Sequence, residues 1–341
     1  MFNAKLQLSI VAILSGALGL AVATDDSSVD AAPRGNAPPQ HQIAQGPAVR
    51  SQQFQISGGH THSMLGRPQP VHRSLLNPRA TGGPVCGGPT SPHPLIDHHG
   101  PLISNVQMYN IGWGPVQNGA DLNRFAGWLA SSWYVSNLAR EYNDSQGRIG
   151  GGRFVRALAA PGRPGDVVRD PEIRTQIESL ILHGQLPAGG PNNAFFVYLP
   201  PRVTAISFDG AVSCHGQSGD CFCGYHGWYI GNNNLPRFYA VIPDLSSDPG
   251  RCGGPFDPVG DRTVAVSHEL AEMITDPSTI SWYSNPGTNQ DGKSVGGQEI
   301  GDVCNGHDRN DHANVFSNAT THGFWVQCEW SNRQNACTDS L

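Results

Sequence analysis

Residues 267–277 read SHELAEMITDP, and this stretch places His268, Glu269 and Glu272 on one predicted helix. Side chains at positions i and i+4 share a helical face, with Cβ atoms about 5–6 Å apart, so His268 and Glu272 can converge on one cation. Glu269 is rotated from His268 by about 100°, where H-E-x-x-H metallopeptidases hold a general base beside the metal ion. Glu272 replaces the second histidine of that pattern, so the stretch predicts a metal-binding helix of the form H-E-x-x-E.

Strands and further helices are predicted on both sides of this helix. The helix is expected to begin near Asp261 and to end at Asp276, because a residue that precedes proline disfavours the helical conformation. Apolar runs predict strands at 103–113, 193–199, 237–242 and 323–330, and helical spacing predicts helices at 121–142 and 170–184. The expected fold class is α+β, with a loop-rich, disulfide-bonded C-terminal part.

A catalytic zinc ion needs about three protein ligands and one open position. His268 and Glu272 supply two of these ligands. The segment 299–304, EIGDVC, is the best source of the third, because it holds two acids, Glu299 and Asp302, and a glycine that allows close approach of the backbone. Either acid would complete the set.

Such a ligand set is richer in oxygen than most zinc sites. Zinc is the expected cofactor, and calcium or manganese is an alternative. His226, within CGYHG at 223–227, is a further candidate, either as a ligand or as a donor to the transition state. The expected catalytic residues are therefore Glu269 and His226.

The N-terminus has the pattern of a secretory signal peptide over residues 1–23. Lys5 gives a basic start, an apolar stretch follows, and Ala21-Val22-Ala23 is a small-residue cleavage site. Residues 24–100 are rich in Pro, Gly, Gln, Ser and His and lack apolar periodicity, which predicts a disordered linker or a pro-segment. The folded domain is therefore expected to span residues 101–341, and the protein is expected to be secreted.

The chain has 8 cysteines, an even number that is expected to form disulfides in an oxidising compartment. Cys304 is expected to pair with Cys328 or Cys337, because the loop-rich C-terminal part lacks long apolar runs. Two sequons, at Asn143 and Asn318, are glycosylation acceptors in a eukaryotic secretory pathway.

Other classes of function lack their sequence patterns. The formal net charge is -6 and there is no run of basic residues, so nucleic acid is not an expected partner. No internal apolar run reaches the roughly 18 residues of a membrane span. The chain has neither a G-x-S-x-G nucleophile elbow nor a G-x-x-x-x-G-K-[ST] phosphate loop.

Eight segments follow one another between Leu102 and Cys337: VQMYNIGWG, FAGWLASSWYVSNLAREY, FFVYLPP, CGYHG, FYAVIPD, VSHELAEMITDP, EIGDVC and VQCEWSN. In this set the chain resembles the phosphate-induced protein 1/exordium family and its secreted microbial relatives. The combination of CGYHG, HELAEMITDP and EIGD-x-C in that order is the specific part of the resemblance.

The plant members of that family are apoplastic proteins linked to growth responses, and their equivalent of residues 267–277 lacks the His-Glu pair. This chain has His268, Glu269 and Glu272, so it is similar to the microbial branch, which looks like a zincin-type metallopeptidase. The resemblance implies a zincin-like mixed sheet with a backing helix, and an active-site helix beneath a cleft.

Two functions follow from these patterns. The first is a secreted metal-dependent hydrolase, with a zinc peptidase as the expected class and a protein or peptide as the expected substrate. The second is a non-catalytic protein of the cell wall or extracellular matrix, in which the same residues hold a structural ion. Glu269 separates the two, because a structural site has no use for a spare carboxylate beside an open coordination position.

Overall fold

The computed structural model describes Cys86 and most of the chain from residue 94 onward, all within the unit Val49–Leu341. The described residues are 86, 94–143, 147–214, 221–247, 252, 257–285, 287–288, 294–295, 297–304, 315–317, 319–339 and 341. The predicted signal peptide, most of the predicted linker and the Asn318 sequon lie outside them. Within them, no helix combines the length and the apolar character needed to cross a bilayer.

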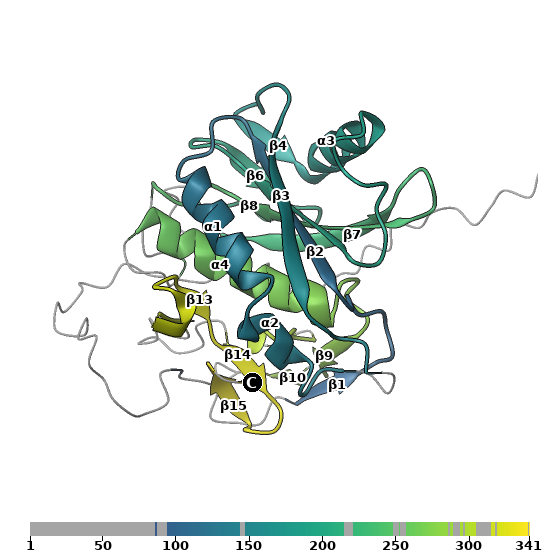
Figure 1. Cartoon of the computed structure of the whole chain (residues 1–341), viewed down its shortest axis with the longest axis vertical. Coiled ribbons are helices and arrows are strands. Elements are labelled where there is room, and N and C mark those ends of the chain that lie inside the picture. The colour runs from purple at the N-terminus through teal and green to yellow at the C-terminus, as the bar shows by residue number, and fades with distance from the viewer. Residues whose placement is uncertain are drawn as a thin grey trace, which may run out of the picture. The chain divides into compact units, whose positions relative to one another are not determined.

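A mixed sheet of five strands organises the domain (Figure 1). Its strands are β2 (Val106–Trp113), β3 (Gly152–Ala160), β5 (Asn193–Tyr198), β7 (Tyr225–Ile230) and β8 (Pro236–Ile242). They lie in the order β3-β2-β5-β8-β7, with β7 antiparallel to β8 at one edge and the other four strands parallel. The structure is therefore mixed α+β, as the sequence predicts.

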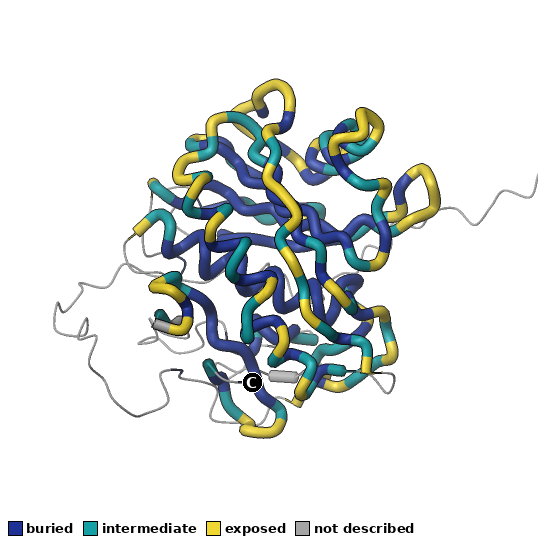
Figure 2. The backbone as a smooth tube through the Cα atoms, viewed as in Figure 1, coloured by how far each residue is buried: buried dark blue, intermediate teal, exposed yellow. Residues whose placement is uncertain are grey.

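The two faces of this sheet pack against different helices. The helices are α1 (Gly119–Leu129), α2 (Trp133–Leu138), α3 (Asp170–Leu182) and α4 (Pro258–Thr275). In β5, Phe196 packs in the same apolar cluster as α1 and α4, whereas Phe195 packs in the cluster that contains α3. All residues of β5 are buried, which is typical of a central strand covered by helices on both sides. Helix α4 is also buried over most of its length (dark blue in Figure 2).

The helix predicted at 121–142 is two helices. The chain leaves α1 after Leu129, and the Ser132 hydroxyl accepts a hydrogen bond from the Tyr134 backbone N–H at 3.2 Å, which starts α2. The apolar positions expected on the inner face are buried across both helices: Leu122, Phe125, Leu129, Val135, Leu138 and Tyr142. Helical spacing therefore identified the buried face, although it did not show the break.

Helix α4 begins slightly earlier than predicted. Asp257, not Asp261, is its N-cap, and the Asp257 side chain accepts from the Val259 backbone N–H at 3.0 Å. Pro258 occupies the first helical position, where its missing N–H costs nothing. The helix ends at Thr275, immediately before the predicted stop at Asp276.

Short elements complete the domain around α4. They are β1 (Leu95–Asp97), β4 (Val167–Arg169), β6 (Thr204–Ile206), β9 (Trp282–Ser284), β10 (Gly287–Thr288), β11 (Ser294–Val295), η1 (Asp302–Cys304), β12 (Val315–Phe316), η2 (Ala319–Thr321), β13 (Val326–Gln327), β14 (Glu329–Ser331) and β15 (Ala336–Thr338). β1 pairs with β9, so regular structure begins a few residues before the predicted boundary at 101. The single strand predicted at 323–330 is divided, because β13 pairs with β12 and β14 pairs with β15.

All eight cysteines form disulfides. The pairs are Cys86–Cys328, Cys214–Cys221, Cys223–Cys252 and Cys304–Cys337. The predicted pairing of Cys304 with one of the two late cysteines is confirmed. Because Cys304 ends η1, this bridge ties the EIGD segment to β15.

The Asn143 sequon is engaged in hydrogen bonds within the domain. Its Nδ2 donates to the Ala139 carbonyl at 2.8 Å, and its Oδ1 accepts from the Ile149 backbone N–H at 2.7 Å. A glycan on Nδ2 would have to displace the first of these bonds. Glycosylation at either sequon stays a prediction.

Removal of the Cys304–Cys337 bridge by a double alanine substitution is expected to lower the free energy of unfolding by about 3–4 kcal/mol, because the bridge closes a loop with a sequence separation of 33. Removal of Cys214–Cys221, with a separation of 7, is expected to cost less, about 2–3 kcal/mol. Urea unfolding followed by tryptophan fluorescence measures both losses. A larger loss for the shorter loop would contradict this expectation.

Candidate metal centre

Helix α4 carries three of the predicted site residues in a buried position. His268, Glu269 and Glu272 are 3%, 1% and 0% exposed. One helical turn separates His268 from Glu272, and the facing atoms, Nε2 and Oε2, are 3.1 Å apart. The i, i+4 spacing therefore brings these two side chains together.

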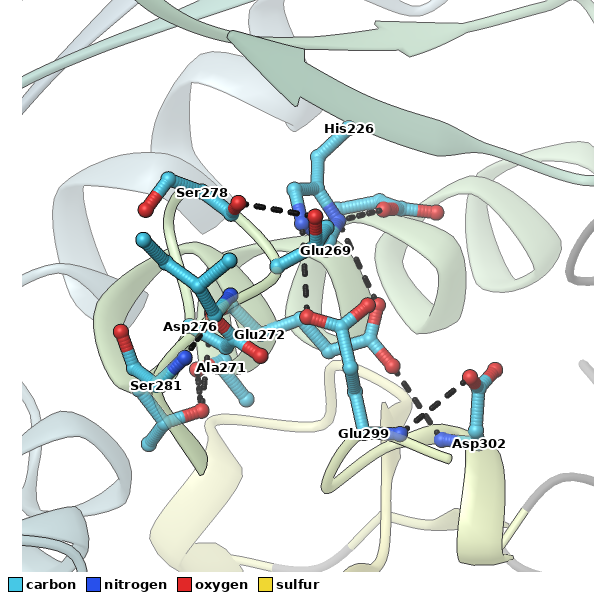
Figure 3. Close-up of polar contacts among 12 residues, drawn as sticks. His226, Glu269, Ala271, Glu272, Asp276, Ser278, Ser281, Glu299 and Asp302 are labelled. Atoms are coloured by element: carbon cyan, nitrogen blue, oxygen red, sulfur yellow. Dashed lines mark hydrogen bonds and ion pairs between the residues drawn. The ribbon is translucent and has the colours of Figure 1, made fainter. Parts of the chain in front are cut away.

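The edge strand β7 brings His226 to the same place from the sheet (Figure 3). His226 Nδ1 lies 3.2 Å from Glu269 Oε2 and 3.4 Å from Glu272 Oε2. On the other side of the ring, Nε2 is 3.6 Å from Glu299 Oε1. His226 is thus held between two acids of α4 and one acid of the EIGD segment.

The two acids of the EIGD segment face different imidazoles. The Asp302 backbone N–H donates to Glu272 Oε1 at 3.2 Å, and Asp302 Oδ1 lies 4.0 Å from His268 Nε2. Glu299 instead faces His226, and its backbone N–H donates weakly to Asp302 Oδ2 at 3.4 Å. The structure therefore brings both acids to the centre, with Asp302 as the one beside the His268–Glu272 pair.

Two glycines allow backbone to approach these side chains closely. A Cβ atom at Gly301 would lie 2.5 Å from His268 Nδ1, and one at Gly224 would lie 2.8 Å from Glu269 Oε1. Real Cβ atoms essentially never approach other atoms so closely, so a larger residue at Gly301 would displace the His268 ring and one at Gly224 would displace the Glu269 carboxylate. The close approach predicted from the glycine of EIGD is observed, and CGYHG uses its first glycine in the same way.

Two buried polar residues near the cluster have no counterpart among the predicted site residues. Gln327 Oε1 is 3.1 Å from His268 Nδ1, and Glu329 accepts a hydrogen bond from the hydroxyl of Tyr134 in α2. Both side chains are buried, and they flank Cys328. Residues two apart in an extended chain point to the same side, so the alternation in VQCEW was a signal that could identify them.

The carboxylates determine the charge state of both imidazoles. Burial alone would lower the pKa of His226, but Glu299 and the two glutamates of α4 outweigh burial and raise that pKa well above 6.5. The pKa of His268 is raised in the same sense, because burial is outweighed by Glu272 and the acids around it. Both histidines therefore hold a proton tightly when no other cation is present.

Acids outnumber imidazoles in this buried cluster. Four carboxylates, from Glu269, Glu272, Glu299 and Asp302, face two histidines. Burial raises the pKa of Glu299 well above 4.5, and His226 only partly offsets the rise. Because a buried, uncompensated carboxylate is unfavourable by several kcal/mol, the cluster favours extra protons or a divalent cation.

Within the part of the chain that the structure describes, two groups of potential ligand atoms lie at this cluster, and within each group all atoms are within 4.8 Å of one another. The groups are His226, Glu272 and Glu299, and His268, Glu269 and Glu272. Glu272 belongs to both. A further group of cysteine sulfurs meets the same distance limit, but its members are Cys214, Cys223 and Cys252, which are disulfide-bonded and present no thiolate.

The separations in the cluster fit a small divalent cation. Two ligands of a tetrahedral zinc ion with bonds of about 2.0–2.1 Å lie about 3.3 Å apart. Glu272 Oε2 is 3.1 Å from His268 Nε2 and 3.4 Å from His226 Nδ1. Imidazole together with carboxylate is a ligand set for zinc or manganese, and the number of oxygens keeps calcium as an alternative.

Comparison of the chain with protein-family models, with curated proteins and with solved structures found no match. The family resemblance read from the sequence therefore stays a prediction. The geometry of the cluster is the basis for the functional argument below.

Replacement of Gly301 by alanine is expected to push the His268 ring away from Glu272 and to weaken divalent metal binding at least tenfold, as outer-shell changes do. Gly119→Ala is the matched control, because a Cβ there meets nothing within 4 Å. Isothermal titration with zinc measures both variants. Unchanged zinc affinity in Gly301→Ala would contradict the close packing on His268.

The metal-free protein is expected to lose stability as the pH rises from about 4.5. The pKa values of Glu299 and Glu329 are raised above 4.5, mainly by burial, and those of His226 and His268 are raised above 6.5 by nearby acids. The folded state therefore binds more protons than the unfolded state, and the free energy of unfolding falls with pH, first through the acids and above about 6.5 also through the histidines.

Urea unfolding at a series of pH values, with a chelator present, measures this slope. The variant Glu329→Gln removes one of the titrating groups and is expected to give a shallower fall than the wild-type protein. A free energy of unfolding that rises from mildly acidic to neutral pH in the chelated protein would contradict the expectation.

Proposed function

We propose that this domain is a metal-dependent hydrolase that acts on a peptide or protein outside the cell. The observation that carries the proposal is the position of Glu269. Glu269 directly follows His268 on α4. Its carboxylate is buried and lies 3.2 Å from His226 Nδ1, close to the His268–Glu272 pair. A carboxylate in this place is suited to move a proton beside a cation.

The ion would be held by His268 and Glu272, with Asp302 as the nearest acid to complete the set. Glu272 is already oriented for this role, because its Oε1 accepts from the Asp302 N–H while its Oε2 faces both imidazoles. His226, from β7, and Glu299, from the EIGD segment, would lie beside these residues rather than bind the ion. A divalent ion bound here would polarise a scissile carbonyl and lower the pKa of water.

Glu269 would take a proton from the attacking water and pass it to the leaving amine. His226, whose pKa is raised by the surrounding acids, would be protonated. Its Nδ1–H is directed at Glu269, so its Nε2–H would be the donor to the oxyanion as it forms, and Glu299 would lie beside that donor at 3.6 Å.

A peptide is the preferred substrate because of the scaffold. The sequence resemblance implies a mixed sheet with a backing helix and an active-site helix for a zincin-like peptidase, and the mixed five-stranded sheet together with the helix bearing H-E-x-x-E is consistent with that expectation. The four disulfides are consistent with an oxidising, extracellular environment.

The burial of the cluster favours a second candidate function. His226, His268, Glu269, Glu272 and Glu299 are each no more than 7% exposed. A fully enclosed ion site is typical of structural metals, which suits a non-catalytic protein of the cell wall or matrix. In that case Glu269 would serve only to hold His226.

The substitution Glu269→Gln separates the two functions. In a hydrolase it is expected to leave zinc bound and to lower turnover by about 10²–10⁴, because the base is lost and the ligands remain. His268→Ala is expected to lose zinc and activity together. Cleavage of a quenched-fluorescent peptide library and zinc content by mass spectrometry are the measurements.

Glu172→Gln, the same chemical change at an exposed position in the first turn of α3, is the matched control and should behave as wild type. Zinc bound at one ion per chain, with no peptide cut by wild type and with Glu269→Gln as stable as wild type, would favour the structural role. A wild-type protein that binds no divalent ion would exclude both metal-based functions.

A further inference from the structure

We infer that Gln327 is a positioning residue for the candidate metal centre, and that it commits His268 to the tautomer whose Nε2 accepts a cation. The inference deepens the proposed function and rests on it for the metal. Three hydrogen bonds of Gln327, to Ser267, Gly301 and His268, support the inference.

The backbone of Gln327 is attached to the active helix. Gln327 lies in β13 and is fully buried. Its backbone N–H donates to the Ser267 hydroxyl at 2.9 Å, and Ser267 directly precedes His268 in α4. The Ser267 hydroxyl in turn donates to the Val264 carbonyl at 2.8 Å, so its lone pairs are oriented towards β13. The position of Gln327 relative to His268 is therefore fixed by the main chain.

The orientation of the Gln327 amide is fixed by the Gly301 carbonyl. Gln327 Nε2 lies 2.7 Å from the Gly301 carbonyl oxygen. A carbonyl only accepts hydrogen bonds, so the amide must present its N–H₂ group there. Its oxygen, Oε1, then faces the opposite way, 3.1 Å from His268 Nδ1. The reverse orientation would place two acceptor oxygens against each other.

This orientation determines which nitrogen of His268 can give up its proton to a metal ion. Because Oε1 only accepts, it stabilises the proton on His268 Nδ1, and Nε2 is then the nitrogen whose proton a metal ion can replace. Nε2 faces Glu272 Oε2 at 3.1 Å, and a carboxylate oxygen is also an acceptor. Two acceptors at this distance repel each other unless a proton or a metal ion lies between them. Gln327 thus makes the His268–Glu272 pair a site that needs a cation.

Gln327 also couples this pair to the EIGD segment. The residue that follows Gly301 is Asp302, whose backbone N–H donates to Glu272 Oε1. The Gln327 amide therefore bridges α4 and the segment that supplies the nearest acid. Loss of its N–H₂ group removes the hydrogen bond to Gly301 and should make the position of Asp302 less fixed. Loss of its oxygen removes the acceptor that holds the proton on His268 Nδ1. The two ends of one amide have separable effects.

Two variants test these effects. Gln327→Leu keeps similar bulk but removes both functions, and Gln327→Glu keeps an acceptor for His268 while it removes the donor to Gly301. Gln185→Leu, at an exposed position after α3 on the other side of the sheet, is the matched control. The readouts are the zinc dissociation constant and the nitrogen NMR spectrum of protein with ¹⁵N-labelled histidine, with His268→Ala used to assign the signal.

In metal-free wild type, where His268 holds its protons, the Nδ1 proton is expected to be visible and to be protected from exchange by Gln327 Oε1. Gln327→Leu removes this acceptor and is expected to speed exchange of the Nδ1 proton and to weaken zinc binding about 10–100-fold, as outer-shell changes do. Gln327→Glu is expected to keep the protected Nδ1 proton and to lose less affinity. The control should match wild type in both.

A wild-type Nδ1 proton that exchanges as fast as an exposed one, or a Gln327→Leu variant with unchanged exchange and zinc affinity, would overturn the inference. Failure of the wild-type protein to bind zinc, manganese or calcium would overturn the proposed metal centre instead. The Nδ1 proton is observed without metal, so it decides the role of Gln327 independently of that result.

Discussion

The negative charge buried around Glu272 is the constraint on which the rest of this domain depends. The Glu272 side chain is fully enclosed and meets an imidazole from its own helix, an imidazole from the sheet and a backbone N–H from the EIGD segment. A carboxylate in such surroundings is tolerated only with compensating partners. The fold must therefore hold three segments, distant in sequence, within hydrogen-bonding distance of one side chain.

The scaffold meets this requirement through pairing and crosslinks on each side of α4. Strand β7 is paired with β8 along its whole length, which fixes the height of His226 above the helix. The bridge Cys223–Cys252 holds the chain just before this strand, and Cys304–Cys337 holds the chain just after Asp302. Both segments that bear site residues are thus covalently restrained close to the cluster.

A catalytic and a structural metal site would use the same residues differently. His268, Glu272, Asp302 and Gln327 suit both kinds of site, because both need groups that hold a cation. Glu269 is different, since its contact with His226 places a carboxylate beside the pair without making it a necessary ligand. The hydrolase proposal therefore depends on the chemistry of one side chain, whereas the metal proposal depends on the charge of the whole cluster.

Local spacing allowed much of this to be predicted from the sequence alone. The convergence of His268 with Glu272 and the buried face of the helices from Leu122 to Tyr142 follow from helical periodicity. The pairing of Cys304 with one of the two late cysteines was predicted from the secretory signal and the loop-rich C-terminal part, without a choice between Cys328 and Cys337. The edge strands β3 and β7 were missed, because edge strands lack a continuous apolar pattern: β3 is exposed over most of its length and β7 contains a glycine.

Tertiary structure alone decided which groups meet. That Glu299 faces His226 while Asp302 faces His268 depends on how η1 packs on α4, and the role of Gln327 depends on a carbonyl twenty-six positions away that fixes its amide. These contacts join residues that are far apart in the chain, so no periodicity records them. The sequence determined the chemistry available to the site, and the packing of β7, β13 and the EIGD segment on one helix determined how that chemistry is arranged.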